Sequence, residues 1–420
     1  MRGECKGALF GSTMKPRRKL NFSGLTVAIA ASLLMGCSFG HPLVGIFPGD
    51  ESDESDENQL ALGLIGGAAL AAAGDGVQGT VVLRYAYVGG SSSTVHQFAV
   101  NDTTGVFTAL SPATVGSGAN VWDLEAHPNN NFMYAADRTG GVVYQYAVNA
   151  LYGQLSPLAP ATVVTTSSDP VGMAIHPGGA HAYVGFLSGS GIDMFSIDAA
   201  TGLWTAKTPG NVGGCSGAKD MVFHPNGNFL FVVCDGGNNI TRYSIDGAGQ
   251  LTSLGGTGGI GTQPSGLGIT PDGAYLYVTN QQTSQVFLFA VDGATGSLSA
   301  LGTPSVTTDT WPSKAALDAT GQYAYVNCWN GGAQSVRMYR IGAGTGLLSD
   351  NAPASISTGG VQPIDMRGDP TGRYIYALNS GSDSVNMYTI DSATGLLTSN
   401  GLQPASGNPR GIAFVTETVF

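Results

Sequence analysis

From residue 77 to the C-terminus, short apolar or alternating runs are separated by turn-forming residues. The clearest copy of this pattern covers 264–298, where breaks at 271–273, 281–284 and 292–296 divide four β-prone runs. Gly, Asp and Asn at the breaks favour tight turns, and the runs between them have the length and composition of strands. The pattern predicts a four-stranded antiparallel meander.

One aromatic position of this unit recurs at intervals of 46 to 51 residues through the rest of the chain. It is occupied by Tyr87, Tyr134, Tyr183, Phe231, Tyr277, Tyr325 and Tyr376. A four-stranded unit that repeats at this period is typical of a β-propeller blade. The sequence therefore predicts an all-β fold, a seven-bladed β-propeller of four-stranded antiparallel blades.

The first copy begins with its second strand, around 85–89, and has no good first strand before it. The missing strand lies at the other end of the chain, because 409–415 aligns with 170–176, the first strand of another copy. We therefore expect the C-terminal strand to pair into the N-terminal blade and close the ring. Closure of this kind leaves no exposed inner edge.

The first 36 residues have the features of an export signal. A basic stretch, 15–19, precedes the apolar run 25–35, and the run ends in Leu34-Met-Gly-Cys37. This ending resembles the lipobox of bacterial lipoproteins, which implies that 1–36 is a signal peptide and that Cys37 carries a lipid. An ordinary signal peptide and an uncleaved anchor are the alternatives. Ser38, in place of Asp, favours the outer membrane in a host that has two membranes.

Residues 37–76 are expected to form a tether before the propeller of 77–420. Its acidic run, 50–57, repels itself and has no capacity to form a core. The Gly/Ala-rich segment 60–73 is shorter than the roughly 20 residues that a membrane-spanning helix needs. The sequence leaves open whether this segment is a linker or a helix packed on the propeller.

Composition narrows the range of partners. Residues 37–420 contain 11 basic and 27 acidic residues, a formal net charge of −16. A surface this acidic repels nucleic acid and anionic lipid headgroups. We expect no nucleic-acid partner and membrane attachment through the lipid anchor alone.

The repeat also carries a family resemblance. The tetrapeptide Tyr277-Val-Thr-Asn280, the preceding Pro-Asp-Gly turn and the repeated Thr-Gly units resemble YVTN-type propellers and the lactonase family of seven-bladed propellers. The resemblance covers about 77–420 and implies lactone hydrolysis of the 6-phosphogluconolactonase type. That family typically has Pro-Arg-His at the start of one inner strand. Here Pro409-Arg410 is followed by Gly411, which leaves the acid or base for lactone opening unidentified.

Other chemical motifs are absent or have structural explanations. No Gly-x-Ser-x-Gly, His-Glu-x-x-His, Cys-x-x-Cys or P-loop pattern occurs. His127, His176 and His224 occupy the same turn of three different blades, so a structural role is favoured over metal binding. The Asn and Asp residues before each outer hairpin are expected to cap turns. We expect neither a metal nor a cofactor.

Alignment of the seven inner strands indicates a candidate ligand site near the ring axis. One column contains Asp123, Asp220, Lys314 and Asp365 among glycines, and two positions further the same face carries Glu125 and Arg367. Charges near the axis are costly unless they pair, as Lys314 and Asp365 on adjacent blades could, or face a hydrated channel mouth. The further candidates at the same rim are Trp122, Trp311, Lys219 and Arg410.

Two cysteines are candidates for a disulfide. Cys215 enters the first strand of the fourth blade and Cys234 ends the neighbouring strand, so the loop between them is short enough to close. Export would permit oxidation, and free buried thiols are the alternative.

These observations favour an exported, lipid-anchored propeller that binds a protein, glycan or small molecule at the cell envelope. The alternative is a lactonase-like hydrolase that opens a lactone outside the cytoplasm. Catalytic residues stay unassigned in both cases.

Overall fold

A computed structural model describes residues 79–329 and 334–419, which all belong to one unit, 61–420. The predicted signal peptide 1–36, the lipid site Cys37 and the tether with its segment 60–73 lie outside the described residues. Within the described ranges, no helix has the length and apolar character needed to cross a membrane.

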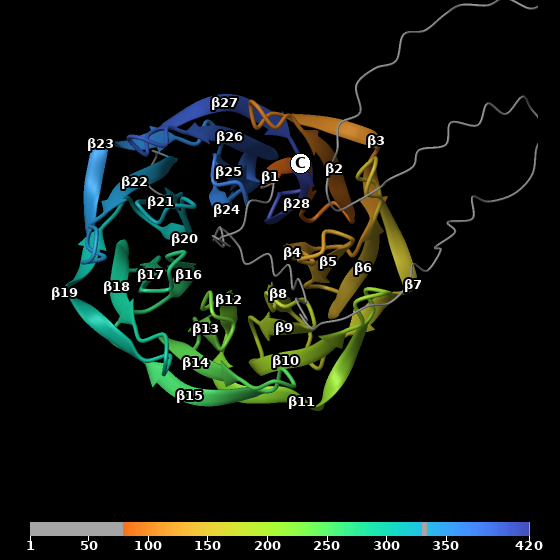
Figure 1. Ribbon diagram of the computed structural model, residues 1–420, viewed down its shortest axis with the longest axis horizontal. Helices are drawn as coiled ribbons and strands as arrows, with labels where there is room; N and C mark the ends of the chain where they lie inside the picture. Colours follow the sequence, from red (N-terminus) through yellow and green to blue (C-terminus); the bar gives the residue numbers. More distant parts are fainter. Residues whose placement is uncertain (1–78, 330–333, 420) are drawn as a thin grey trace, which may run out of the picture. The chain divides into compact units, whose positions relative to one another are not determined.

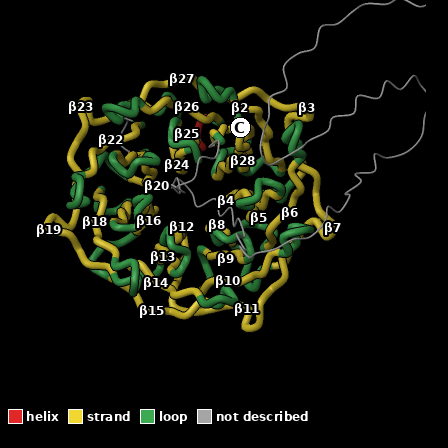
Figure 2. The backbone as a smooth tube through the Cα atoms, viewed as in Figure 1, coloured by secondary structure: helices red, strands yellow, loops and turns green. Residues whose placement is uncertain are grey.

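The described chain consists almost entirely of short antiparallel strands, with one 3₁₀ turn, η1 (Ser380–Ser382). Figure 1 shows the strands arranged as a ring, and Figure 2 shows, in the same view, the loops that join them. The strands are β1 (Thr80–Gly89), β2 (Thr94–Val100), β3 (Phe107–Gly116), β4 (Val121–Ala126), β5 (Phe132–Asp137), β6 (Val142–Val148), β7 (Leu155–Val164), β8 (Pro170–Ile175), β9 (His181–Phe186), β10 (Ser190–Ile197), β11 (Trp204–Ser216), β12 (Ala218–Phe223), β13 (Phe229–Cys234), β14 (Asn239–Ile245), β15 (Leu251–Thr257), β16 (Pro264–Ile269), β17 (Tyr275–Asn280), β18 (Gln285–Val291), β19 (Leu298–Thr307), β20 (Pro312–Leu317), β21 (Tyr323–Cys328), β22 (Ser335–Ile341), β23 (Leu348–Ser357), β24 (Pro363–Gly368), β25 (Tyr374–Asn379), β26 (Ser384–Ile390), β27 (Leu397–Pro404) and β28 (Gly411–Val419).

The strands form seven four-stranded sheets, as the repeat predicts. Six blades use four consecutive strands, and the remaining blade has the order β28-β1-β2-β3. In that blade β28 pairs antiparallel with β1, from Thr80 opposite Val419 to Gly89 opposite Gly411. The predicted closure of the ring by the C-terminal strand is confirmed. The innermost strands around the axis are β4, β8, β12, β16, β20, β24 and β28.

The recurring aromatic residues join each blade to the next. Tyr277, which is fully buried on β17, donates its hydroxyl hydrogen to the Gly346 carbonyl of the following blade at 2.9 Å. The equivalent tyrosines make the same bond, including Tyr376 to Gly105 across the closing seam. The glycine has a positive φ, and a Cβ on Gly346 would meet the Tyr275 ring at 2.2 Å. The Thr-Gly unit therefore recurs because this turn has room for no side chain.

The one blade with Phe at the aromatic position replaces the missing donor. Phe231 pairs in register with Arg242 on β14, and the Arg242 guanidinium donates to the Gly296 carbonyl at 3.3 Å. In this blade the Arg242 guanidinium thus replaces the tyrosine hydroxyl as the donor that links the blade to the next one.

The Asn and Asp residues before the outer hairpins cap those turns, as expected. Asp292 accepts hydrogen bonds from the amides of Ala294 and Thr295, and Asn101 accepts from the amides of Thr103 and Thr104. The backbone amides that donate to these side chains would otherwise lack partners in the tight turn.

The three repeated histidines also have structural partners. His127 Nδ1 accepts from the Asn129 amide at 3.1 Å, and its Nε2 lies 2.8 Å from the Gly179 carbonyl of the next blade. His176 repeats this arrangement with the Gly178 amide and the Gly227 carbonyl. His224 accepts from the Asn226 amide in the same way. All three rings thus hold their turns closed, and those of His127 and His176 also link the turn to the next blade.

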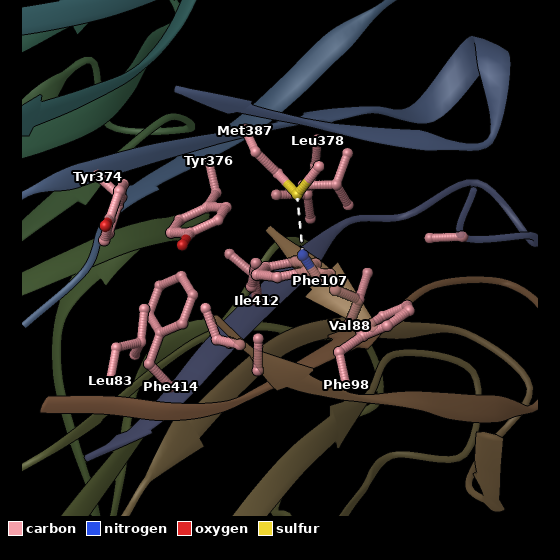
Figure 3. Packing of buried hydrophobic residues seen from close by; sticks show 14 residues of the cluster. Leu83, Val88, Phe98, Phe107, Tyr374, Tyr376, Leu378, Met387, Ile412 and Phe414 are labelled. Atoms are coloured by element: carbon pink, nitrogen blue, oxygen red, sulfur yellow. Dashed lines mark hydrogen bonds between the residues drawn. The ribbon is translucent and has the colours of Figure 1, made fainter. Parts of the chain in front are cut away.

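The closing seam has its own apolar cluster, shown in Figure 3. Tyr376 and Met387 of one blade pack against Phe107 and Phe414 of the blade that contains both chain ends. The Tyr376 ring lies 4.8 Å from the Phe107 ring and 5.0 Å from the Phe414 ring. Burial of this many aromatic groups makes the seam between these two blades a hydrophobic junction.

A disulfide connects Cys215 at the end of β11 to Cys234 at the end of β13, with their Cα atoms 5.3 Å apart. The bond ties the outer strand of one blade to the second strand of the next. Cys328 is free and buried.

Candidate functional site

The inner strands position the candidate residues through a shared irregularity. In β4, Val121 pairs with Asp137 and Asp123 pairs with Ala136, so Trp122 is an extra residue in a bulge. In β12 the extra residue is Lys219. Arg410 occupies the corresponding place immediately before β28. Bulges re-aim side chains at the ends of strands. We call the ring of positions where the inner strands begin the upstream rim.

Trp122 and Arg410 come together at this rim, with a residue that the sequence did not single out. The Arg410 guanidinium lies 4.4 Å from the centre of the Trp122 ring, and the Arg138 guanidinium lies 4.5 Å from it. Arg138 is ion-paired with Asp169, which also accepts from the Ser188 hydroxyl. Arg410 has no such carboxylate partner among the described residues, and its Nε is buried without a hydrogen bond. Burial and the Arg138 charge lower the Arg410 pKa.

The other rim candidates form separate local pairs. Lys219 lies 3.3 Å from Asp235 and 3.4 Å from the Gln281 side-chain oxygen. The Trp311 ring meets the Trp329 ring edge-on at 5.1 Å. Trp329 is the second residue that the sequence reasoning missed, since it follows β21 and lies outside the aligned inner strands.

The charged column lies further along the inner strands and is largely paired internally. Asp123 bridges two blades, because its Oδ2 accepts from the Met173 amide of the next blade at 2.8 Å. Its Oδ1 accepts from the Leu124 amide and from Arg367 Nη2, both at 2.9 Å. The same Arg367 nitrogen also donates to Glu125 at 2.7 Å.

Asp220 repeats this bridge two blades further. Its Oδ2 accepts from the Leu267 amide at 2.8 Å, and its Oδ1 accepts from the Met221 amide and from Lys314 Nζ. The Lys314 ion pair with Asp220 measures 2.5 Å. The sequence considered Asp365 on the adjacent blade as the partner of Lys314. The structure instead has Lys314 pair with Asp220 two blades away, past the inner strand β16, where two backbone amides hold the Asp220 carboxylate.

The electrostatics reflect close packing of these groups. Burial raises the pKa of Asp123 to about 7, opposed by Arg367 and reinforced by the Glu125 and Asp365 carboxylates. Burial would lower the pKa of Lys314, but the carboxylates of Asp220, Asp365 and Asp123 hold it above its usual range. Lys314 and Arg367 therefore stay charged, and Asp123 titrates near neutral pH.

A cavity of about 460 Å³ opens where the inner strands end, on the opposite face from the upstream rim. Glu125, Asp220, Lys314 and Arg367 line it together with apolar side chains such as Leu267 and Met366. The candidates thus divide into an upstream group around Trp122 and a downstream group at this cavity. The described residues contain no group of three or more His, Cys, Asp or Glu side chains suited to a metal ion.

Comparison with known proteins places this architecture in a family. Three overlapping stretches, 83–211, 192–354 and 303–414, match the family described as Lactonase, 7-bladed beta-propeller. Together they span nearly all of the described chain, and the protein belongs to this family. No curated protein sequence matches it.

Solved structures agree on the fold. A candidate 6-phosphogluconolactonase of Bacteroides uniformis superposes with a TM-score of 0.69 at 21% identity, covering 79% of this chain and 99% of its own. A periplasmic gluconolactonase of Pseudomonas aeruginosa gives 0.66 at 18% identity, covering 80% and 99%. A Lactobacillus plantarum protein gives 0.67 at 20%, covering 79% and 99%. At these identities the likeness shows the fold alone.

Proposed function

We propose that this propeller hydrolyses a lactone at the upstream rim, with Arg410 as the group that binds the lactone carbonyl. Arg410 occupies the position of the arginine in the Pro-Arg-His motif that the family resemblance implies. The observation that carries the proposal is the state of its guanidinium, which is stacked on Trp122, close to Arg138 and without a carboxylate partner in the described chain.

A guanidinium in this position favours an incoming negative charge. Burial and the second guanidinium lower the Arg410 pKa, which means that they destabilise the charged guanidinium. A negatively charged oxygen beside Arg410 would offset this destabilisation. In lactone opening, water adds its oxygen to the carbonyl carbon and gives up one proton to a base, and the carbonyl oxygen becomes negative. The carbonyl then re-forms as the ring C–O bond breaks, and the ring oxygen takes up one proton, so that lactone and water give the hydroxy acid. Arg410 would stabilise the intermediate oxyanion.

The substrate class that we propose is an unphosphorylated sugar lactone outside the cytoplasm. One structural neighbour is a periplasmic gluconolactonase. The formal charge of −16 over 37–420 disfavours a dianionic phosphate ester. Attachment to the cell envelope through a lipid on Cys37 is part of the same proposal.

The test measures acid release from D-glucono-1,5-lactone and its 6-phosphate above the buffer rate, using the full mature protein. Arg410→Gln should lower kcat/KM by about 100-fold, as loss of an oxyanion donor does, and Arg410→Lys should lower it less. Arg84→Gln, which alters an exposed arginine paired with Glu417, is the matched control. If the protein hydrolyses neither lactone faster than the buffer does, the proposal is overturned.

A second candidate is binding without turnover, which one observation favours. Gly411 stands where the family motif has His, and the described His127 and His176 are engaged in turns. Calorimetry with gluconate separates the two functions. Arg410-dependent binding by a parent protein that shows no turnover would support the binding function, and absence of both would exclude the rim as the site.

A further inference from the structure

The column near the axis contains three aspartates, each followed on the next blade by a glycine. Asp123 precedes Gly172, Asp220 precedes Gly266, and Asp365 precedes Gly411 around the ring. The glycines let the inner strand of the following blade approach closely, since a Cβ on Gly266 would meet the Ser313 carbonyl oxygen at 2.5 Å and one on Gly411 would meet the Asp123 Cα at 2.9 Å. The first two aspartates accept a hydrogen bond from the amide of the residue after the glycine.

The third aspartate, Asp365, does not accept such a hydrogen bond. No hydrogen bond joins Asp365 to the Ile412 amide, and within the described residues its carboxylate has no hydrogen bond or ion pair. Its Oδ1 is buried without a partner, and the residue is only 6% exposed. Asp365 and Ile412 lie on β24 and β28, which pack least closely of the seven neighbouring inner-strand pairs.

Each of the two other aspartates forms an ion pair with a basic side chain. Asp123 has a cation from Arg367, and Asp220 has a cation from Lys314. Both cations are already committed, and Arg367 is shared with Glu125. Asp365 interacts with Lys314, Arg367 and Asp123 only over longer range. The group as a whole therefore has two more carboxylates than cations, and a buried unpaired carboxylate is costly.

We propose that Asp365 binds a monovalent cation at the seam between β24 and β28. The cation supplies the charge that Arg367 and Lys314 supply to the other two aspartates. A single carboxylate suits a singly charged ion, and no cluster of three acidic, His or Cys ligands in the described chain calls for a divalent metal. The source of the charge is an alkali ion or a small protonated amine, since both offer one positive charge in a compact volume.

The experiment compares thermal unfolding of the full mature protein in chloride salts at equal ionic strength. Potassium, sodium and methylammonium test the two sources, and tetramethylammonium has the same charge but is too large and has no N–H donor. A cation that binds the folded state raises Tm by mass action, by about 1–3 °C for a tenfold to hundredfold excess over Kd. Sodium or potassium should act if the source is an alkali ion, and methylammonium if it is an amine.

Asp365→Asn should remove the difference between the salts. Asp350→Asn, which alters a half-exposed aspartate on an outer strand, should keep it. Equal Tm values for the parent in all four salts, or an undiminished difference in Asp365→Asn, would overturn the proposal. If Asp365→Asn does not fold, rubidium anomalous scattering from crystals of the parent decides, with a peak beside Asp365 as support and no peak there as refutation.

Discussion

At the scale of single residues, the charged groups near the axis combine a structural role with titration at neutral pH. Asp123 is tied to the backbone of two blades and to Arg367, yet burial raises its pKa to about 7. Such a carboxyl binds its proton more tightly in the folded chain than in the unfolded chain, where its pKa is about 3.9. Its contribution to stability is therefore full below about pH 4 and is lost as the pH rises through 7.

Asp123→Asn should flatten the pH dependence of unfolding. Relative to the parent, the variant should lose less stability between pH 4 and pH 8, by an amount on the order of 1–3 kcal/mol. Urea unfolding across this range measures the difference. Asp350→Asn controls for the loss of one negative charge. Parallel pH profiles for the parent and Asp123→Asn would show that the group does not titrate in this range.

The same residues show the limit of sequence reasoning. Alignment of the inner strands correctly brought Asp123, Glu125 and Arg367 to one place, because strand periodicity determines which residues share a face. It missed that Lys314 pairs with Asp220 two blades away, since that choice depends on distances between blades that are not neighbours. Arg138 was missed for a related reason, because it follows the second strand of its blade and approaches Trp122 only in the folded ring.

At the scale of strands and blades, the architecture was fully predictable. Turn residues at regular spacing defined the meander, and the Tyr series defined its repeat. The hydrogen bond of the repeated tyrosine could not be predicted from the sequence, because its partner lies in the next blade, as Gly346 does for Tyr277.

Tyr277→Phe should destabilise the protein by about 1–2 kcal/mol, since it leaves a buried carbonyl at Gly346 without its donor while the ring stays in place. Chemical denaturation measures this loss. Tyr152→Phe removes a hydroxyl from a tyrosine that is 61% exposed and should change stability little. Equal stability of Tyr277→Phe and the parent would indicate that water or a shifted side chain supplies the bond.

At the scale of the whole molecule, the envelope attachment that we propose depends on residues before the propeller. Cys37→Ser should release the protein from membranes or block its maturation, because the lipid-bearing thiol is lost. Membrane fractionation with detection of the propeller measures this. Cys328→Ser is the matched control, since that free cysteine is buried in β21. A Cys37→Ser variant that still fractionates with membranes would place the anchor elsewhere, with 60–73 as the next segment to test.

The pairing of β1 with β28 has a consequence for how the chain could be rearranged. Thr80 and Val419 are directly opposite each other in the sheet, so a short hairpin turn could join the two ends without disturbing the blade. A new start could then be placed in the loop that joins two other blades, where an outermost strand leads to the next innermost strand. Every blade would then be a continuous meander, and the seam would move to whichever junction was cut. The covalent order of the blades is thus separable from the ring that they form, which makes the molecule a natural candidate for circular permutation.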